Sequence, residues 1–164
     1  MFVEYIGVSQ NLPNEISFFK EELVTTTFKL KEELKDVLKI ISVSVDVEIK
    51  SMKLINTDVR TSNEGQRLSG KKLLVETNFK FRIKYLSDSK EKYLYLLKSS
   101  MSKVIYVVLP REYENYKIED IARKKAIGVK IYIEDIFSKP RSNREIYIRN
   151  LVLVDVFVKK NLIY

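Results

Sequence analysis

The chain of 164 residues contains no cysteine and no histidine. Without cysteine it has no disulfide, no thiol nucleophile and no cysteine-ligated zinc site. Without histidine it lacks the side chain that most often serves as a general base near neutral pH. Only carboxylates, lysines and tyrosines remain for acid–base chemistry. We therefore expect a protein that is not an enzyme and that uses neither a metal nor another cofactor.

Glycine and proline are scarce as well, with four and three residues, and no stretch rich in either would link two domains. No apolar run approaches the roughly 18 residues of a membrane-spanning helix. The start, Met1 to Tyr5, lacks the basic segment and apolar core of a signal peptide. We expect no membrane span and a chain that stays in the compartment where it is made.

Charge is plentiful and unevenly distributed, with a formal net charge of +8. Residues 1–27 carry four Glu against one Lys, whereas residues 123–160 carry ten Lys or Arg against four Asp or Glu. We interpret residues 1–20 as an acidic N-terminal arm able to add an edge strand. Residues 21–164 are then a single β domain.

Alternation of apolar and polar residues is the strongest periodicity in the chain. In Ile41–Ile49 and Leu73–Tyr85 it predicts strands with one buried and one wet face. Glu145–Val158 is apolar on both faces over much of its length, which is typical of a central strand. Further strands are predicted at Val24–Leu30, Tyr93–Leu97, Val104–Leu109 and Val129–Ile133.

Helical spacing of apolar residues occurs in two short segments, Leu30–Ile40 and Ile118–Ala126. Each lies between two predicted strands, so the order strand, helix, strand, loop, long strand occurs twice along the chain. We infer an internal pseudo-repeat. The expected fold is mainly β, an antiparallel β-sandwich or barrel with two short helices.

The segment Glu64–Glu76 holds two of the four glycines and leads into a long strand. It lacks the Gly-Lys-Ser/Thr ending of a phosphate-binding loop, and no helix follows it. We interpret Gly65 and Gly70 as turn residues chosen for backbone shape.

Basic residues and tyrosines offer a candidate interaction surface. Basic side chains alternate along one predicted strand, a second basic cluster lies at the end of the second predicted helix, and tyrosines occur on other strands. The candidate residues are Lys80, Arg82, Lys84, Tyr93, Tyr95, Arg123, Lys124 and Lys125. Such a surface suits protein–protein contacts. Nucleic-acid binding by charge and stacking is a less favoured alternative, and a small-ligand-binding β barrel is another.

The order of motifs resembles the SPOCS family, the domain of clostridial spore coat and spore morphogenesis proteins. Glu64–Glu76 is similar to the family's central signature, Phe81–Asp88 to its Ile-x-Tyr-Val-Ala-Asp motif, Val129–Ile136 to its acid-ended tyrosine strand, and Arg144–Val158 to its last strand. The likeness extends over residues 2–158 and leaves no room for the LysM domain that some members carry.

The resemblance implies a non-enzymatic structural protein of the bacterial spore envelope. Such a protein is made in the mother-cell cytoplasm and recruited to the forespore surface, where its partners are other coat proteins or further copies of itself. The absence of cysteine excludes disulfide cross-links, so tyrosine-based cross-linking is the covalent alternative.

Overall fold

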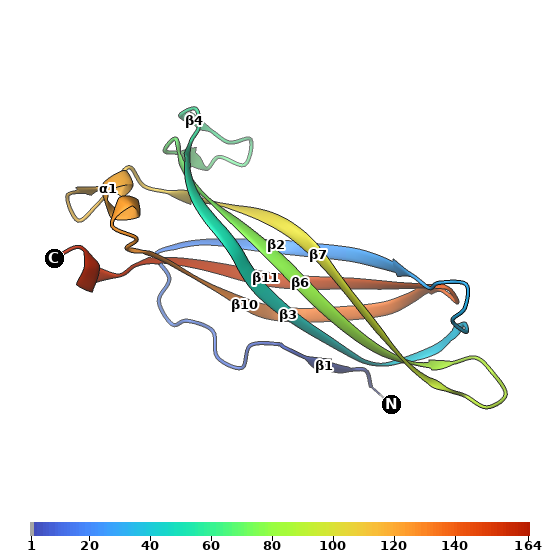
Figure 1. Ribbon diagram of the computed structural model, residues 1–164. Helices are drawn as coiled ribbons and strands as arrows, with labels where there is room; N and C mark the ends of the chain where they lie inside the picture. The colour runs from blue at the N-terminus through green and yellow to red at the C-terminus, as the bar shows by residue number, and fades with distance from the viewer. Residues whose placement is uncertain (1) are drawn as a thin grey trace.

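The computed structural model describes residues 2–164 and is mainly β (Figure 1). Its strands form two principal sheets. The first sheet has the order β1 (Glu4–Ile6), β3 (Val37–Asn56), β6 (Lys71–Ser87) and β7 (Leu94–Leu109). The second sheet has the order β10 (Ile127–Ser142), β11 (Glu145–Val158) and β2 (Phe18–Lys29). The expectation of a mainly β protein is confirmed.

The remaining elements are short. Two small hairpins pair β4 (Arg60–Thr61) with β5 (Arg67–Leu68) and β8 (Glu112–Tyr113) with β9 (Tyr116–Lys117). The helix α1 (Ile118–Arg123) follows β9, and the 3₁₀ turn η1 (Lys160–Leu162) follows β11. Across the described part of the chain, no helix has the length and apolar character needed to cross a membrane.

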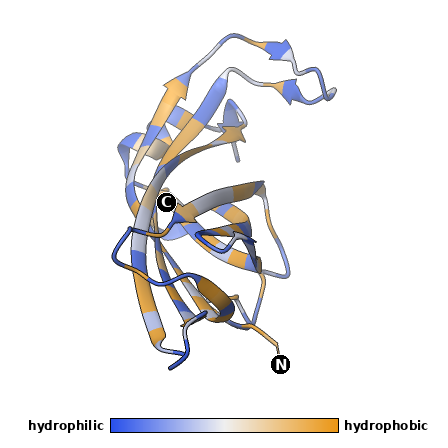
Figure 2. Ribbon diagram, turned by 90° about the vertical axis from the view of Figure 1, so that its right-hand side faces the viewer, coloured by the Kyte–Doolittle hydropathy of each residue, from blue (hydrophilic) through white to orange (hydrophobic). Residues whose placement is uncertain are grey.

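A single apolar core is shared by the two sheets. Phe79 and Phe81 of β6 are almost fully buried, and the Phe81 ring meets Phe28 of β2 edge to face with 5.1 Å between centroids. Ile118 and Ile121 of α1 belong to the same core. In Figure 2, apolar segments run along the strands of the sheets, whereas the projecting β4–β5 hairpin is mostly hydrophilic. Burial of one face of each sheet in this shared core therefore stabilises the contact between the two sheets.

The strands do not close into a barrel, so that part of the expectation is wrong. The two open edges β2 and β7 lie close together, but no ladder joins them; the Lys103–Glu22 ion pair at 3.3 Å bridges them. Along the opposite side, the N-terminal segment connects the sheets, because the Ser9 amide donates to the Ile133 carbonyl oxygen at 2.8 Å.

The strand predictions are largely confirmed. β11 has the predicted bounds, Glu145–Val158, and it is the central strand of the second sheet. The two strands predicted at Tyr93–Leu97 and Val104–Leu109 are one strand, β7. The polar residues between the two predicted strands indicated a loop. They instead form the exposed middle of an edge strand, where polar side chains face water without a cost in stability.

The helix predicted at Leu30–Ile40 is wrong. A turn follows β2, and β3 begins at Val37. Register shifts between Val37 and Lys39 and between Ile40 and Ser42 each place one extra residue in β3. Buried side chains therefore recur every third residue, at Val37, Ile40 and Val43, and imitate helical spacing. The second predicted helix exists as α1, which ends three residues earlier than expected.

The two halves of the chain exchange their first strands. In the first half β3 pairs with β6, and in the second half β10 pairs with β11. β2, which precedes β3, lies beside β11, whereas β7, which precedes β10, lies beside β6. The internal pseudo-repeat stays a prediction, and the helix that it requires between β2 and β3 is absent from the described residues.

The N-terminal arm contributes β1, which pairs in parallel with Ser42–Ser44 of β3. The boundary placed after residue 20 falls inside β2, which begins at Phe18. The Tyr5 hydroxyl hydrogen-bonds Ser138 of β10 at 3.2 Å. The first strand therefore contacts both sheets.

Asn150 is the least favourable residue of the core. Its side chain is fully buried on the core-facing side of β11, between Ile136 and Val24 in the ladders, and its amide has no hydrogen-bond partner among residues 2–164. Burying an unpaired amide costs about 1–3 kcal/mol.

We therefore predict that Asn150→Leu stabilises the protein. Removal of the unpaired amide should raise the free energy of unfolding by about 1–3 kcal/mol in urea denaturation. Asn150→Val tests the same point with a smaller side chain that fits without overpacking. Unchanged or reduced stability in both variants would show that the amide has a partner in solution.

Candidate functional site

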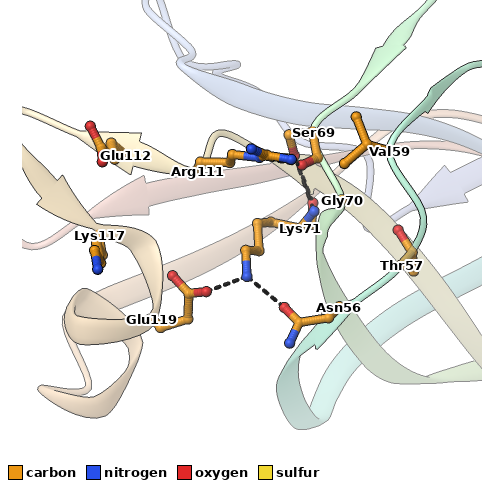
Figure 3. A pocket seen from close by; sticks show the side chains of 10 residues that line it. All are labelled: Asn56, Thr57, Val59, Ser69, Gly70, Lys71, Arg111, Glu112, Lys117 and Glu119. Carbon is orange, nitrogen blue, oxygen red and sulfur yellow. Dashed lines mark hydrogen bonds and ion pairs between the residues drawn. The ribbon is translucent and has the colours of Figure 1, made fainter.

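A polar cleft lies where the first sheet meets α1 (Figure 3). It has a volume of about 370 Å³ and is lined by residues that follow β3, precede β6, follow β7 and begin α1. Its charged residues are Lys71, Arg111, Glu112, Lys117 and Glu119. It is the place where the glycine-containing segment singled out in the sequence meets the second half of the chain.

Gly70 shapes the backbone on one side of this cleft, and Gly65 lies in the turn of the nearby β4–β5 hairpin. Gly65 and Gly70 both have φ of +83°, a conformation that residues with a Cβ rarely adopt. A Cβ on Gly70 would lie 2.9 Å from the Thr57 carbonyl oxygen, and the Thr57 amide donates to the Gly70 carbonyl at 3.0 Å. Gly70 therefore permits the close approach that joins β3 to β6.

Lys71 joins the cleft wall to α1. Its Nζ donates to the Asn56 Oδ1 at 2.7 Å and to the Glu119 carboxylate, as the dashed lines in Figure 3 show. The hydrogen bond from Lys71 holds the pKa of Glu119 below its usual value of 4.5, and the Glu119 backbone amide lowers it further. The pair thus fixes the start of the helix on the first sheet.

Other polar groups of the cleft form hydrogen bonds with the backbone. The Arg111 Nε donates to the Ser69 carbonyl oxygen at 3.0 Å, and the Lys71 amide donates to the Ser69 hydroxyl at 3.1 Å. The segment continues into β6 rather than into a helix, so its amides do not converge on an anion. These contacts support a structural joint between the two halves of the chain.

The predicted basic row lies elsewhere, on the outer side of the first sheet. Lys80, Arg82 and Lys84 are exposed on β6, and Arg82 is paired in the ladder with Lys98 of β7. Lys80 contacts the Glu48 carboxylate at 2.9 Å, which raises the pKa of Lys80 and lowers that of Glu48. An inner strand of the first sheet therefore presents basic side chains to solvent.

The two predicted tyrosines do not share this surface. Tyr95 is half-buried on the core-facing side of β7, where it stacks on Tyr85 with 5.4 Å between ring centroids. Tyr93 is exposed and precedes β7. A surface for stacking of nucleic-acid bases needs aromatic rings beside the cations, and these two tyrosines do not provide it.

The second basic cluster, Arg123 to Lys125, is separate from the first. Arg123 pairs with Asp120 at 3.1 Å, and Lys124 lies over the Tyr116 ring at 5.6 Å. α1 contacts β6 at Lys71, nine residues before Lys80, which corresponds to about 30 Å along a strand. The two basic groups therefore do not form one surface.

The outer side of the second sheet carries residues that the sequence analysis did not single out. Glu134 lies at a bulge in β10, and its Oε2 is buried without a hydrogen-bond partner in residues 2–164. Asp155 of β11 is only 7% exposed, and burial raises its pKa. The sequence signal that could have identified Asp155 is the pattern of Glu145–Val158, because the positions on the outer side of this strand are apolar apart from a few charged residues.

Comparisons with known proteins return nothing similar: no family model, no curated protein and no solved structure matches the chain. Among the residues the structure describes, no three acidic side chains gather in a way that would hold a metal ion.

We predict that Glu119→Gln destabilises the protein by about 0.2–1 kcal/mol at pH 7, the range of an exposed ion pair. Because the pKa of Glu119 is lowered on folding, the pair stabilises the protein above about pH 4.5 and is lost as the pH falls through the lower folded value. The difference between variant and wild type should therefore shrink below pH 4.5. Urea denaturation at several pH values measures it.

Glu112→Gln is the matched control, since Glu112 lines the same cleft and forms no ion pair within residues 2–164. Amide hydrogen exchange of α1 should become faster only in the Glu119 variant. Equal effects of the two substitutions would contradict a specific role for the Lys71–Glu119 pair.

Proposed function

We propose that the chain is a non-enzymatic structural protein that acts through protein–protein contacts of its sheets. The observation that carries this proposal is the exposure of large apolar side chains on the outer sides of both sheets. Phe19 and Leu23 of β2 are 50% and 54% exposed, and Leu94 and Leu96 of β7 are 61% and 49% exposed. Exposed apolar side chains that gather on the outer sides of sheets are a feature of interaction sites.

The arrangement of the two sheets supports the same proposal. We infer a β-sandwich, since residues of both sheets pack into one core and α1 covers one end of it. A two-layer protein of this type has no third layer, so each sheet keeps one side for contacts. The exposed apolar residues on those sides lie outside the shared core, so they are available for contact with a partner.

The setting we propose is the spore envelope of a spore-forming bacterium. Its support is the resemblance of the motif order to the SPOCS family, together with the exposed apolar surface just described. The protein would be recruited from the mother-cell cytoplasm to the forespore surface and held there by other coat proteins or by further copies of itself. Tyr164, Tyr93 and Tyr106, which are 77%, 52% and 48% exposed, are the tyrosines best placed for cross-linking.

We predict that a fluorescent fusion of the full chain gathers around the forespore during sporulation. The test is microscopy of sporulating cells, with electron microscopy of the coat in a deletion strain. Diffuse fluorescence throughout sporulation, with an unaltered coat in the deletion strain, would overturn the proposed function.

A further inference from the structure

One edge of the first sheet is open. β7 pairs with β6 on one side, and among residues 2–164 no strand pairs with its other side. The β6–β7 ladder has no register shift, and β7 contains no proline. Bulges and prolines are common means by which an edge strand avoids pairing with a further strand. β7 therefore keeps a regular backbone to which another strand can add.

The alternation of the ladder shows which backbone groups of β7 face the open side. The Ser87 amide donates to the Tyr93 carbonyl oxygen at 2.9 Å, just before Leu86 pairs with Leu94. In an antiparallel ladder, every second residue bonds the neighbouring strand, and the residues between them direct their backbone groups the other way. The N–H and C=O groups of the even-numbered residues of Leu94–Ser100 therefore point away from β6. No backbone hydrogen bond among the described residues uses them.

A cleft of about 360 Å³ adjoins this part of β7 on its core-facing side. Its apolar lining comes from Phe28 of β2, from Leu34 in the turn after β2, and from Leu97 of β7. All three side chains are half-buried. Because the cleft lies between the open edges β2 and β7, it can receive side chains from a strand that adds to β7.

Basic side chains line this cleft and a second one on the outer side of the same segment. Lys29 and Lys31 line the first cleft, and Lys80 and Arg82 line the second. Lys98, which belongs to β7 itself, lines both. Cations are therefore present on both sides of the open edge.

Ion pairs compensate only part of this charge. Lys29 and Lys80 are paired with Glu145 and Glu48. The other three cations form no ion pair within residues 2–164, and the described linings of the two clefts contain one carboxylate, Glu33. The edge of β7 thus offers unpaired positive charge to a partner.

Charge also decides which kind of strand can add. A second β7 in antiparallel pairing would bring Lys98 towards its own copy, and like charges across a ladder destabilise the pairing. A strand with carboxylates on its outer side would instead meet Lys98 and Arg82 with opposite charge. The lysine protects the edge against copies of itself and leaves it open to an acidic strand.

We propose that β7 binds an extended segment of a partner protein in which acidic and apolar residues alternate, and that this segment adds to the first sheet beside Leu94–Ser100. The inference rests on the proposed function, of which it names the contact and the chemistry of the partner. The backbone of the segment bonds the unpaired backbone groups of β7. Its acidic side chains lie on the outer side next to Lys98, and its apolar side chains enter the cleft beside Leu97.

The same contact covers part of the exposed apolar surface. Leu94 and Leu96 lie on the outer side of β7 and are 61% and 49% exposed. A neighbouring strand brings the Cβ atoms of its opposite residues to within about 4.5–5.5 Å of theirs. Strand addition therefore removes water from both leucines.

The test uses the purified, isotope-labelled full chain and a synthetic peptide, Val-Glu-Val-Glu-Val-Glu-Val, blocked at both ends. We expect the peptide to bind with a dissociation constant below about 1 mM. Amide signals of Leu94–Ser100 should shift in nuclear magnetic resonance spectra. Exchange of the even-numbered amides with solvent should slow by about tenfold at saturation, because these amides gain a hydrogen-bond partner.

Two further peptides distinguish strand addition from attraction by charge alone. A fully N-methylated form keeps every side chain but has no N–H group to donate. A peptide of glutamates alone, of the same length, keeps the acidic charge but has no apolar side chains. Each should bind about tenfold more weakly than the alternating peptide. Equal binding of either one would overturn the proposal.

Lys98→Glu tests the edge itself. It should weaken binding of the acidic peptide by about tenfold and strengthen binding of Val-Lys-Val-Lys-Val-Lys-Val. Lys139→Glu is the matched control, because it makes the same change of charge at an exposed position of the second sheet and should bind like the wild type. If Lys98→Glu does not fold, Arg82→Glu repeats the test at an exposed position of β6.

An alternating peptide that fails to bind the wild type at about 1 mM would overturn the strand addition. So would signal shifts that leave Leu94–Ser100 unaffected. If the fusion still gathers around the forespore in either case, the proposed function survives with another surface as the contact. A diffuse fusion with an unaltered coat would remove the proposed function, whereas peptide binding at β7 would still establish this edge as a binding site.

Discussion

The structure depends on one constraint. Each strand has two faces, but the described residues form one shared core, so only one face of each strand can be buried in that core. The two sheets meet at that core through side chains such as Phe79, Phe81 and Val152. No further layer covers their outer sides, as the alternation of β6 makes plain, with every second residue buried from Leu73 to Ser87. Apolar residues on those outer sides are either covered by neighbours of the same side, as Leu153 is, or left to face water or a partner.

This constraint links the fold to the proposed function. A strand that needs to fill only one core alternates between apolar and polar residues, as Ile41–Ile49 does. β11 instead carries apolar residues on both sides, although only its inner side belongs to the shared core. Neighbouring side chains already bury Leu153, so the apolar residues left for the proposed contacts are those of the edge strands, such as Phe19 of β2 and Leu94 of β7. The polar cleft beside α1 has a structural role, because the Lys71–Glu119 hydrogen bond joins the two halves of the chain.

Local periodicity predicted most of the strands and the position of α1, and it gave the bounds of β11 without error. It failed where the ladder is irregular, because bulges in β3 gave Val37, Ile40 and Val43 the spacing of a helix. It also divided β7, since a polar stretch on an edge strand looks like a loop. The carboxylates on the outer side of the second sheet could not be predicted as neighbours. Glu21, Glu134 and Asp155 are far apart in sequence, and they come together only because β2 and β10 both pair with β11. The basic row was visible because its residues alternate on a single strand.

The account makes one central claim, that the exposed apolar side chains on the outer sides of the sheets bring molecules together. Sedimentation velocity of the wild-type chain over a wide range of concentration tests this claim for contacts between copies of the chain. The account predicts a sedimentation coefficient that rises with concentration. A coefficient that stays at the monomer value at every concentration would contradict it.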